Sequence, residues 1–321
     1  MTAMFAPFSI ATGRLQCASR LLRGLSVATL AANVLIVVTG GTVRLTASGL
    51  GCPTWPRCTD DSYITTPENG LHGYVEFGNR ILTFVLAVVV ISTLIVAWLQ
   101  RPRRRSVLLL AGVQVAGIAG QAALGGVTVL TGLNPWTVAS HFLLSMALIF
   151  GAYALYRRVR EGDGEPLRLV TEPLRWLMRG IVAVTVIVLV LGTVVTGSGP
   201  HSGSGNAPRT GLDPNVMSQI HADAVFVLFG LTVGAWFALR TVAAPIKLQQ
   251  AVTVLLGVQL AQGAIGITQY LTDLPMALVA MHMLGACAVW VATLAVLVET
   301  RSRPASVSPS STRGAPRAPC T

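Results

Sequence analysis

The feature that most constrains this chain is a series of eight apolar stretches, each about 20 residues long. They cover residues 25–45, 78–99, 107–130, 138–156, 180–197, 217–239, 249–271 and 277–298. A helix of about 20 apolar residues is long enough to cross a bilayer. Only 11% of the residues are charged, whereas soluble domains carry about 25%. The sequence therefore predicts an all-α integral membrane protein with eight transmembrane helices.

The distribution of positive charge predicts how these helices are oriented. The net charge is +11, which by itself would also suit a nucleic-acid-binding protein. However, all but four of the 23 Lys and Arg residues lie on one side when the N-terminus is placed in the cytoplasm. The four on the outer side are Arg44, Arg57, Arg80 and Arg209. This bias predicts a multi-pass protein of the cell membrane, with both termini cytoplasmic and no nucleic-acid partner.

A polar segment divides the chain into two halves. Residues 157–179 form the longest predicted inner loop and separate a four-helix unit at 25–156 from a second one at 180–298. Residues 1–24 are predicted to form a cytoplasmic arm. Residues 299–321 are predicted to form a disordered cytoplasmic tail, because they contain almost no large apolar side chains after residue 301.

Repeated residue spacings relate the two halves. Repeats of this length indicate a duplicated helical unit, so we predict two pseudosymmetric four-helix bundles. In each half a glutamine precedes a histidine by 20 residues: Gln121 precedes His141, and Gln262 precedes His282. In each half a similar segment also precedes an earlier histidine: Gly40-Gly-Thr-Val precedes His72, and Leu191-Gly-Thr-Val precedes His221.

Histidines inside an apolar bundle indicate a bound metal or cofactor, because an ionisable residue in a membrane helix is costly and marks a functional site by default. His221 and His282 form the cleaner pair. Two neutral imidazoles can occupy both axial positions of a haem iron. The alternative is that these histidines only form hydrogen bonds between helices.

The first half has a denser polar group on its second helix, besides His141 on its fourth. His72, Glu76 and Asn79 are four and three residues apart, so they share one helix face. A buried Glu76 could act as a base or carry protons. Alternatively, it could form only an ion pair with Arg80, four residues later.

Two further features lie near the outer edge of the first half. Arg44 and Arg80 could bind the propionates of a haem, or they could extend toward lipid phosphates.

Cys52 and Cys58 belong to the first outer loop, Cys-Pro-Thr-Trp-Pro-Arg-Cys. An outer loop lies in an oxidising compartment, where a disulfide is allowed.

The chain resembles the haem A synthase family. The resemblance covers about residues 25–298, and it implies oxidation of the C8 methyl of haem O to a formyl group, giving haem A for terminal oxidases. It also implies eight helices in two pseudosymmetric bundles. The similar segments are Gly41-Thr-Val-Arg-Leu-Thr-Ala-Ser-Gly-Leu-Gly-Cys-Pro-Thr-Trp-Pro-Arg-Cys58, Val75-Glu-Phe-Gly-Asn-Arg80, His141, His221 and His282.

The resemblance also implies roles for individual residues. His221 and His282 would hold haem b in the C-terminal bundle, and His141 would be a ligand to the substrate haem O in the N-terminal bundle. Glu76 would be the catalytic residue that moves protons. The loop cysteines are predicted to form a disulfide. The candidate partners are haem O, the lipid bilayer, a haem O synthase, cytochrome oxidase assembly factors and a second copy of this chain.

One departure concerns the family motif Glu-x-x-His-Arg, which reads Glu76-Phe-Gly-Asn79-Arg80 here. An amide is a poor axial ligand for haem iron, so the N-terminal site has either His141 alone or a second ligand from His72. His72 lies seven residues before Asn79, roughly 10 Å along the helix. We therefore favour one firm ligand and an open sixth position.

The main alternative function is a non-catalytic di-haem b-type electron carrier of the membrane. Duplicated histidines suit both functions, but a carrier requires two saturated irons, which the missing fourth ligand contradicts. A transporter built from repeats is a third class. Transporter repeats are often inverted in the membrane, whereas two units of four helices each are parallel.

Overall fold

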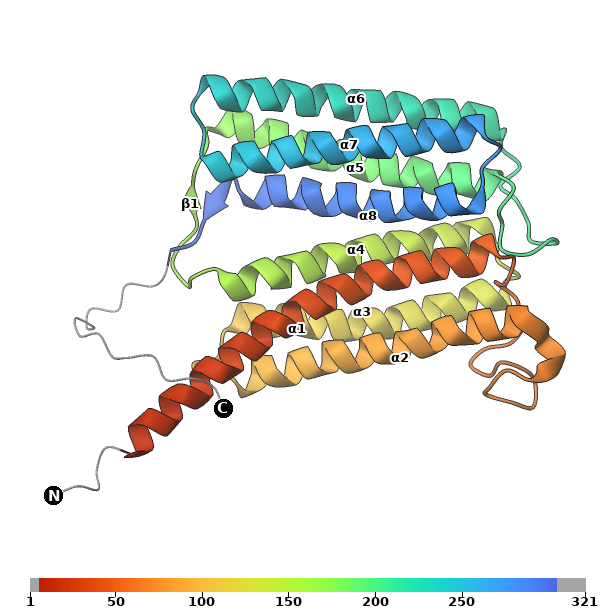
Figure 1. Ribbon diagram of the computed structural model, residues 1–321, viewed down its shortest axis with the longest axis horizontal. Coiled ribbons are helices and arrows are strands. Elements are labelled where there is room, and N and C mark those ends of the chain that lie inside the picture. The colour runs from red at the N-terminus through yellow and green to blue at the C-terminus, as the bar shows by residue number, and fades with distance from the viewer. Residues whose placement is uncertain (1–5, 305–321) are drawn as a thin grey trace.

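Eight long helices make up most of the computed structural model, which describes residues 6–304 and the side chains of residues 19–304 (Figure 1). Each contains a stretch long and apolar enough to cross a membrane, which confirms the predicted all-α multi-pass membrane protein. A 3-10 helix at Pro67–Asn69 and two short strands, β1 (Leu167–Arg168) and β2 (Arg301–Ser302), complete the elements. The helices are α1 (Ala6–Leu45), α2 (Gly70–Leu99), α3 (Arg105–Leu130), α4 (Pro135–Arg160), α5 (Glu172–Ser198), α6 (Pro214–Thr241), α7 (Ile246–Leu271) and α8 (Met276–Val298).

The helices lie side by side, with α5–α8 in the upper part of Figure 1 and α1–α4 in the lower part. Buried apolar side chains such as Ile181 and Leu248 form one cluster within α5–α8, and Leu22 and Leu155 belong to a cluster within α1–α4. A further cluster joins α1 and α4 to α5 and α8. A pseudosymmetric relation between the two sets stays a prediction.

Local sequence signals explain where several helices begin. Pro135 and Pro214 occupy the first turns of α4 and α6. Backbone N–H groups there have no partner within the helix, so the missing N–H of a proline costs no helical hydrogen bond. The side chain of Asn134 accepts a hydrogen bond from the Trp136 backbone N–H at 3.0 Å. Asp213 caps α6 in the same way. These caps satisfy backbone donors that a helix start leaves without partners.

Buried polar side chains connect the helices of the first half. Thr29 of α1 lies 3.0 Å from Thr93 of α2, between hydroxyl oxygens. Asn33 donates to Gln114 of α3 at 3.1 Å, and Gln114 donates to the Leu148 carbonyl of α4 at the same distance. Such hydrogen bonds hold helices together where the surrounding lipid supplies no hydrophobic driving force.

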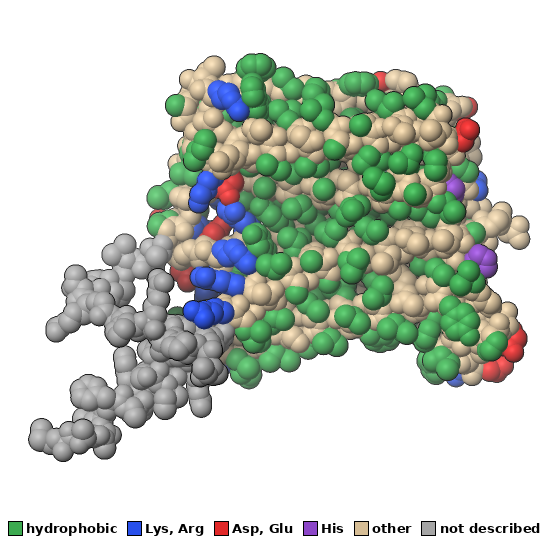
Figure 2. Space-filling model, in the orientation of Figure 1, with side chains coloured by type: hydrophobic (Ala, Val, Ile, Leu, Met, Phe, Trp, Pro, Cys, Tyr) green, Lys and Arg blue, Asp and Glu red, His purple; other side chains and the backbone are tan. Residues whose placement is uncertain are grey.

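The surface has the polarity of a membrane protein. Figure 2 shows apolar side chains along the flank, and Lys and Arg side chains gathered at the end where α4 and α8 finish. Ion pairs at this end include Arg104 with Asp163 at 2.9 Å and Arg157 with Glu299 at 2.7 Å. The pattern agrees with the positive-inside rule, and the cytoplasmic placement of both termini stays a prediction.

The segments outside the membrane spans differ from their predicted bounds. The predicted arm at 1–24 is helical from Ala6 as part of α1, and the helices continue into the predicted linker at 157–179, leaving a loop at 161–171. The tail prediction is wrong for residues 299–304, because β2 pairs antiparallel with β1 in the linker and its neighbours add backbone hydrogen bonds. Residues 305–321 lie outside the described residues.

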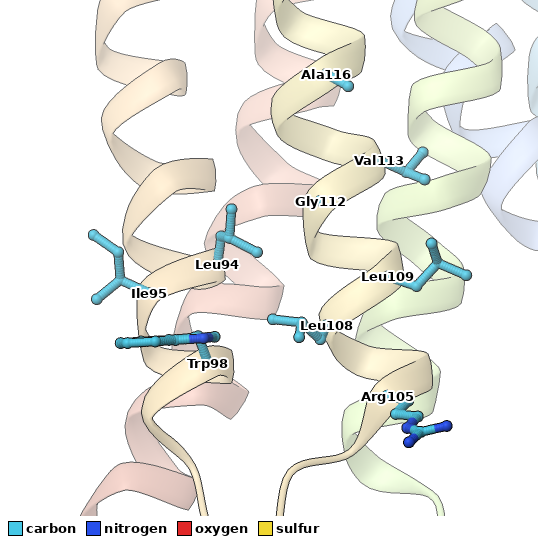
Figure 3. Close-up of a pocket in the computed structure, with 9 residues that line it drawn as sticks. All are labelled: Leu94, Ile95, Trp98, Arg105, Leu108, Leu109, Gly112, Val113 and Ala116. Carbon is cyan, nitrogen blue, oxygen red and sulfur yellow. The ribbon is translucent and has the colours of Figure 1, made fainter.

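An apolar groove of about 810 Å³ runs between α2 and α3 in the half of these helices nearer the charged end (Figure 3). Its walls include Leu94 and Trp98 of α2 and Leu108 and Ala116 of α3. No histidine lines the groove, and the histidine side chains visible in Figure 2 lie at the opposite end of the bundle.

Candidate functional site

The five histidines fall into two groups according to their partners. Among the described residues, the Nδ1 atoms of His141, His221 and His282 are buried without a hydrogen-bond partner. The Val188 backbone lies near the His221 ring, but it makes no hydrogen bond with Nδ1. By contrast, Nδ1 of His72 lies 2.9 Å from the Ser48 hydroxyl, and Nε2 of His201 lies 2.9 Å from the Leu274 carbonyl oxygen. Buried polar atoms normally have partners, so the first three imidazoles are the ones suited to bind a ligand.

Each of these three imidazoles packs against a glycine on the preceding helix. A methyl group at that glycine would crowd the ring, so a bare backbone is what allows the histidine to lie there. The distances from a β-carbon built on the glycine to Cε1 of the histidine are 3.2 Å for Gly125 and His141, 3.3 Å for Gly192 and His221, and 3.1 Å for Gly266 and His282.

Asn79 occupies the fourth position of this pattern. A β-carbon built on Gly40 of α1 would lie 3.8 Å from Nδ2 of Asn79 on α2. The Thr39 hydroxyl donates a hydrogen bond to Oδ1 of Asn79 at 2.8 Å. The predicted parallel between His72 and His221 is therefore wrong, because Asn79 takes the corresponding place. Residues 46–69 insert a longer loop than residues 199–213 do, so equal spacing along the chain does not give equal depth.

The repeated glutamines act on the backbone of the histidine-bearing helices. Nε2 of Gln121 donates to the His141 carbonyl at 3.1 Å, and Nε2 of Gln262 donates to the His282 carbonyl at 2.8 Å. Each glutamine therefore fixes the helical turn that carries a histidine. The 20-residue spacing found in the sequence corresponds to this contact between adjacent helices.

The loop at residues 46–69 covers the end of the bundle beside His141. Cys52 and Cys58 form a disulfide with a Cα–Cα distance of 4.4 Å, which confirms the predicted pairing. The Trp55 ring lies against Gly126 of α3, where a β-carbon would come within 2.4 Å of Cδ2. The adjacent Gly125 faces His141, so the loop lies over this part of the bundle.

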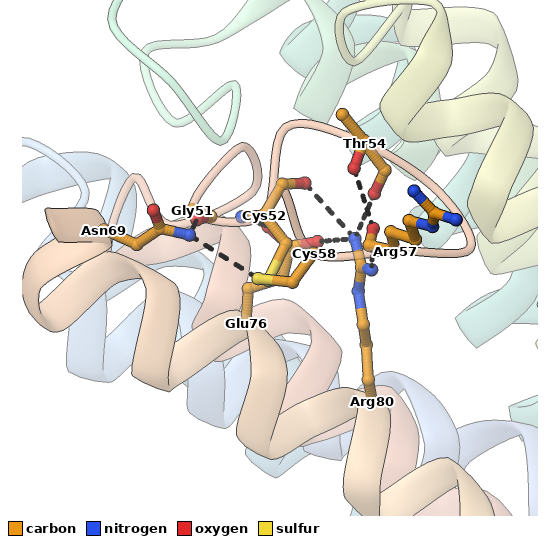
Figure 4. A network of polar contacts seen from close by, with 8 residues as sticks. All are labelled: Gly51, Cys52, Thr54, Arg57, Cys58, Asn69, Glu76 and Arg80. Atoms are coloured by element: carbon orange, nitrogen blue, oxygen red, sulfur yellow. Dashed lines mark hydrogen bonds and ion pairs between the residues drawn. A yellow bond between two sulfur atoms is a disulfide. The ribbon is translucent and has the colours of Figure 1, made fainter. Parts of the chain in front are cut away.

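Glu76 and Arg80 connect this loop to α2 (Figure 4). Glu76 is only 6% exposed, and its carboxylate accepts hydrogen bonds of 2.7 Å from the Cys52 backbone N–H and from Nη2 of Arg80. Arg80 also donates to the carbonyls of Cys52, Thr54 and Arg57 at 3.1–3.2 Å. The ion pair considered from the sequence is present, and it forms part of a larger anchor.

Arg44 and Arg80, the two arginines considered for propionate binding, differ in how fully their guanidinium groups are hydrogen-bonded. The guanidinium of Arg80 is occupied by the loop. Arg44 donates from Nη2 to the Thr196 carbonyl at 2.5 Å, and within the described part of the chain its buried Nε has no hydrogen-bond partner. Of the two, only Arg44 keeps an unsatisfied buried donor for an anionic group.

Sequence reasoning missed Thr39, Trp55 and the glycines that face the histidines. The glycine signal was present: Gly125 and Gly266 each follow the repeated glutamine by four residues. Thr39 and Trp55 had no comparable signal, because their roles depend on which helix lies opposite them.

Together, the fold and the site define a multi-pass helical membrane protein in which three half-buried imidazoles each have a buried Nδ1 atom without a hydrogen-bond partner. Residues 23–211, well over half of the 321, match the COX15-CtaA family, described as cytochrome oxidase assembly protein. The chain belongs to this family.

Several curated proteins are similar over part of the chain. The heme A synthase of Bacillus licheniformis is 26% identical over 181 residues, which are 55% of this chain and 59% of that protein. Those of Lysinibacillus sphaericus and Listeria welshimeri are each 28% identical, over 55% of this chain and 58% and 59% of their own lengths. The match thus spans about three fifths of these relatives. The family match ends before His221 and His282.

Proposed function

We propose that this protein is a haem A synthase, which oxidises the C8 methyl of haem O to a formyl group. The observation that carries the proposal is the set of three imidazoles, each with a buried Nδ1 atom that has no hydrogen-bond partner, in a protein of this family. The similarity to proteins named heme A synthase supports the substrate and the reaction.

His221 and His282 are proposed to hold a haem b in the C-terminal half. Each imidazole faces a glycine of the preceding helix, and each leaves a buried ring nitrogen without a hydrogen-bond partner. Neutral imidazole is a good haem ligand, so these residues fit the group. A haem held there would supply one-electron transfer.

His141 is proposed to bind the substrate haem O in the N-terminal half, with Asn79 on the opposite side. Asn79 takes the place that a second histidine would occupy, and Thr39 holds its amide oxygen. His72 hydrogen-bonds with Ser48 and is not proposed as a ligand. His141 would therefore be the one strong ligand to the haem iron, and the Asn79 amide would bind the iron only weakly.

The apolar groove between α2 and α3 is proposed to receive the farnesyl chain of haem O. Ala116 lies at the end of the groove farthest from Arg105 (Figure 3). It precedes Gly125 by nine residues, or about 13 Å along the helix axis. An extended isoprenoid chain can span that distance from a porphyrin beside His141. Arg44, at the outer end, is proposed to contact a propionate through its unsatisfied Nε.

Glu76 is proposed to have two roles in turnover. Its hydrogen bonds to Cys52 and Arg80 keep the loop closed and limit the access of water. It is also the buried carboxylate of α2 closest in sequence to Asn79, and we propose that it moves protons during oxidation of the methyl. A haem O synthase and oxidase assembly factors are the proposed partners.

Co-expression with a haem O synthase tests the function directly. Haem extracted from the membranes should contain haem A with the wild-type chain, and His141→Ala should abolish it. His201→Ala is the matched control, because His201 is satisfied by the Leu274 carbonyl and should retain activity. Bound haem with no haem A in the wild type would instead favour the electron carrier.

A further inference from the structure

We propose that a basic pocket between α4, α5 and α8 binds the headgroup of one anionic phospholipid. The pocket has a volume of about 320 Å³ and lies at the end of the molecule opposite the disulfide loop. No residue of the haem site lines it. Its charged walls are formed by Arg157, Arg158, Arg175, Arg179, Arg301 and Glu161.

Arginines outnumber carboxylates around this pocket. Four carboxylates form ion pairs with seven guanidinium groups at this end, so positive charge remains in excess. Glu161 pairs with Arg303, and Glu299 pairs with Arg157. Asp163 pairs with Arg104 and Arg158, and Glu172 pairs with Arg168, Arg175 and Arg179. An excess of positive charge at a membrane edge attracts anionic headgroups.

Three arginines retain donors that could reach a phosphate. The Nε of Arg157 is buried and, within residues 19–304, has no hydrogen-bond partner, although its Nη2 pairs with Glu299 at 2.7 Å. In the same part of the chain no ion pair involves Arg301. The Arg179 side chain is 41% exposed, and it lies 3.6 Å from its shared carboxylate. Guanidinium groups bind phosphate oxygens in a bidentate manner.

Part of the pocket lining is apolar, and this favours a lipid over a free phosphate. Leu110, Phe150, Ala154 and Leu294 belong to this part, and Phe150 is 48% exposed. A headgroup among the arginines would therefore place its acyl chains along α4 and α8, in the membrane. Because α4 belongs to the first half and α5 and α8 to the second, the bound lipid would bridge the two halves. Figure 2 shows the charged residues gathered at this end.

Lipid binding can be measured on the full-length protein in mild detergent. Native mass spectrometry would follow titration with phosphatidylglycerol, and with phosphatidylcholine as the zwitterionic reference. The Arg179→Gln/Arg301→Gln variant should bind phosphatidylglycerol about 30-fold more weakly, which corresponds to about 2 kcal/mol for two basic residues. Arg240→Gln is the control, because Arg240 is an exposed arginine at the same end but outside the pocket.

A second variant and a competitor complete the test. Ala154→Leu fills the apolar side without changing charge, and it should weaken phosphatidylglycerol binding while the protein remains monodisperse. Inorganic phosphate at millimolar concentration should not displace the lipid. Equal binding of both lipids, unchanged affinity in the double variant, or complete displacement by inorganic phosphate would each overturn the proposal.

Discussion

Replacing Glu76 with alanine should release the disulfide loop from α2 while the eight helices remain assembled. The carboxylate accepts two hydrogen bonds of 2.7 Å, one from the Cys52 backbone and one from Arg80. Hydrogen bonds to charged groups contribute about 1.5–3 kcal/mol each, and the 20% exposure of the Arg80 side chain reduces its share. We expect the closed loop to lose about 2–3 kcal/mol, so its open population should rise about 30- to 150-fold.

Trypsin applied to the outer face measures this opening. The bond after Arg57 lies inside the loop, and the Arg57 carbonyl accepts a hydrogen bond from Arg80 at 3.1 Å. Cleavage there should follow the open population when opening and closing are fast. The cut falls between Cys52 and Cys58, so the fragments should separate only after reduction of the disulfide. Cleavage after Arg209 in the outer loop at 199–213 provides an internal reference.

Glu76→Gln separates anchoring from proton transfer. A glutamine oxygen can still accept from the Cys52 N–H, so cleavage after Arg57 should rise by only about tenfold, corresponding to the loss of about 1.4 kcal/mol. If this variant keeps the loop largely closed but makes no haem A, the carboxylate also moves protons. An unchanged ratio of cleavage at Arg57 to cleavage at Arg209 in Glu76→Ala would refute the anchoring role.

Other residues give sharper tests of the haem sites and the charged end. His221→Ala should remove the low-spin haem signal of the purified protein, whereas His201→Ala should leave it intact; survival of the signal in both would exclude a ligand role. Asn79→His should add a second imidazole, and electron paramagnetic resonance should then show a new bis-histidine species when haem is bound. Gly192→Ala should cost about 1 kcal/mol or more by crowding the facing ring, seen as faster haem loss to an apoprotein acceptor. Burial tends to raise the pKa of the Asp163 carboxyl, but hydrogen bonds from two arginines outweigh it and leave the pKa below its ordinary value. Its stabilising effect is therefore present above about pH 4 and is lost as the pH falls through the lower folded-state value, so the Tm difference between wild type and Asp163→Asn should shrink in acid.

The sequence by itself determined the eight membrane spans, because hydropathy is a local property and a span needs only enough consecutive apolar residues. It also pointed to His141, His221 and His282, since histidine is rare and costly in such helices. The Cys52–Cys58 disulfide could also be predicted, because two cysteines separated by six residues in one loop can close a disulfide.

Only the tertiary structure decided which polar residues form hydrogen bonds with one another. His72 and Glu76 share a helix face with Asn79 in sequence, yet His72 bonds to Ser48, Glu76 anchors the loop, and Asn79 faces a glycine as the three histidines do. These outcomes depend on the rotation of each helix and on the path of the loops, which bring together residues far apart in the chain. The strand pairing between residues 167–168 and 301–302 has the same origin, because long-range contacts leave no periodic pattern in either segment.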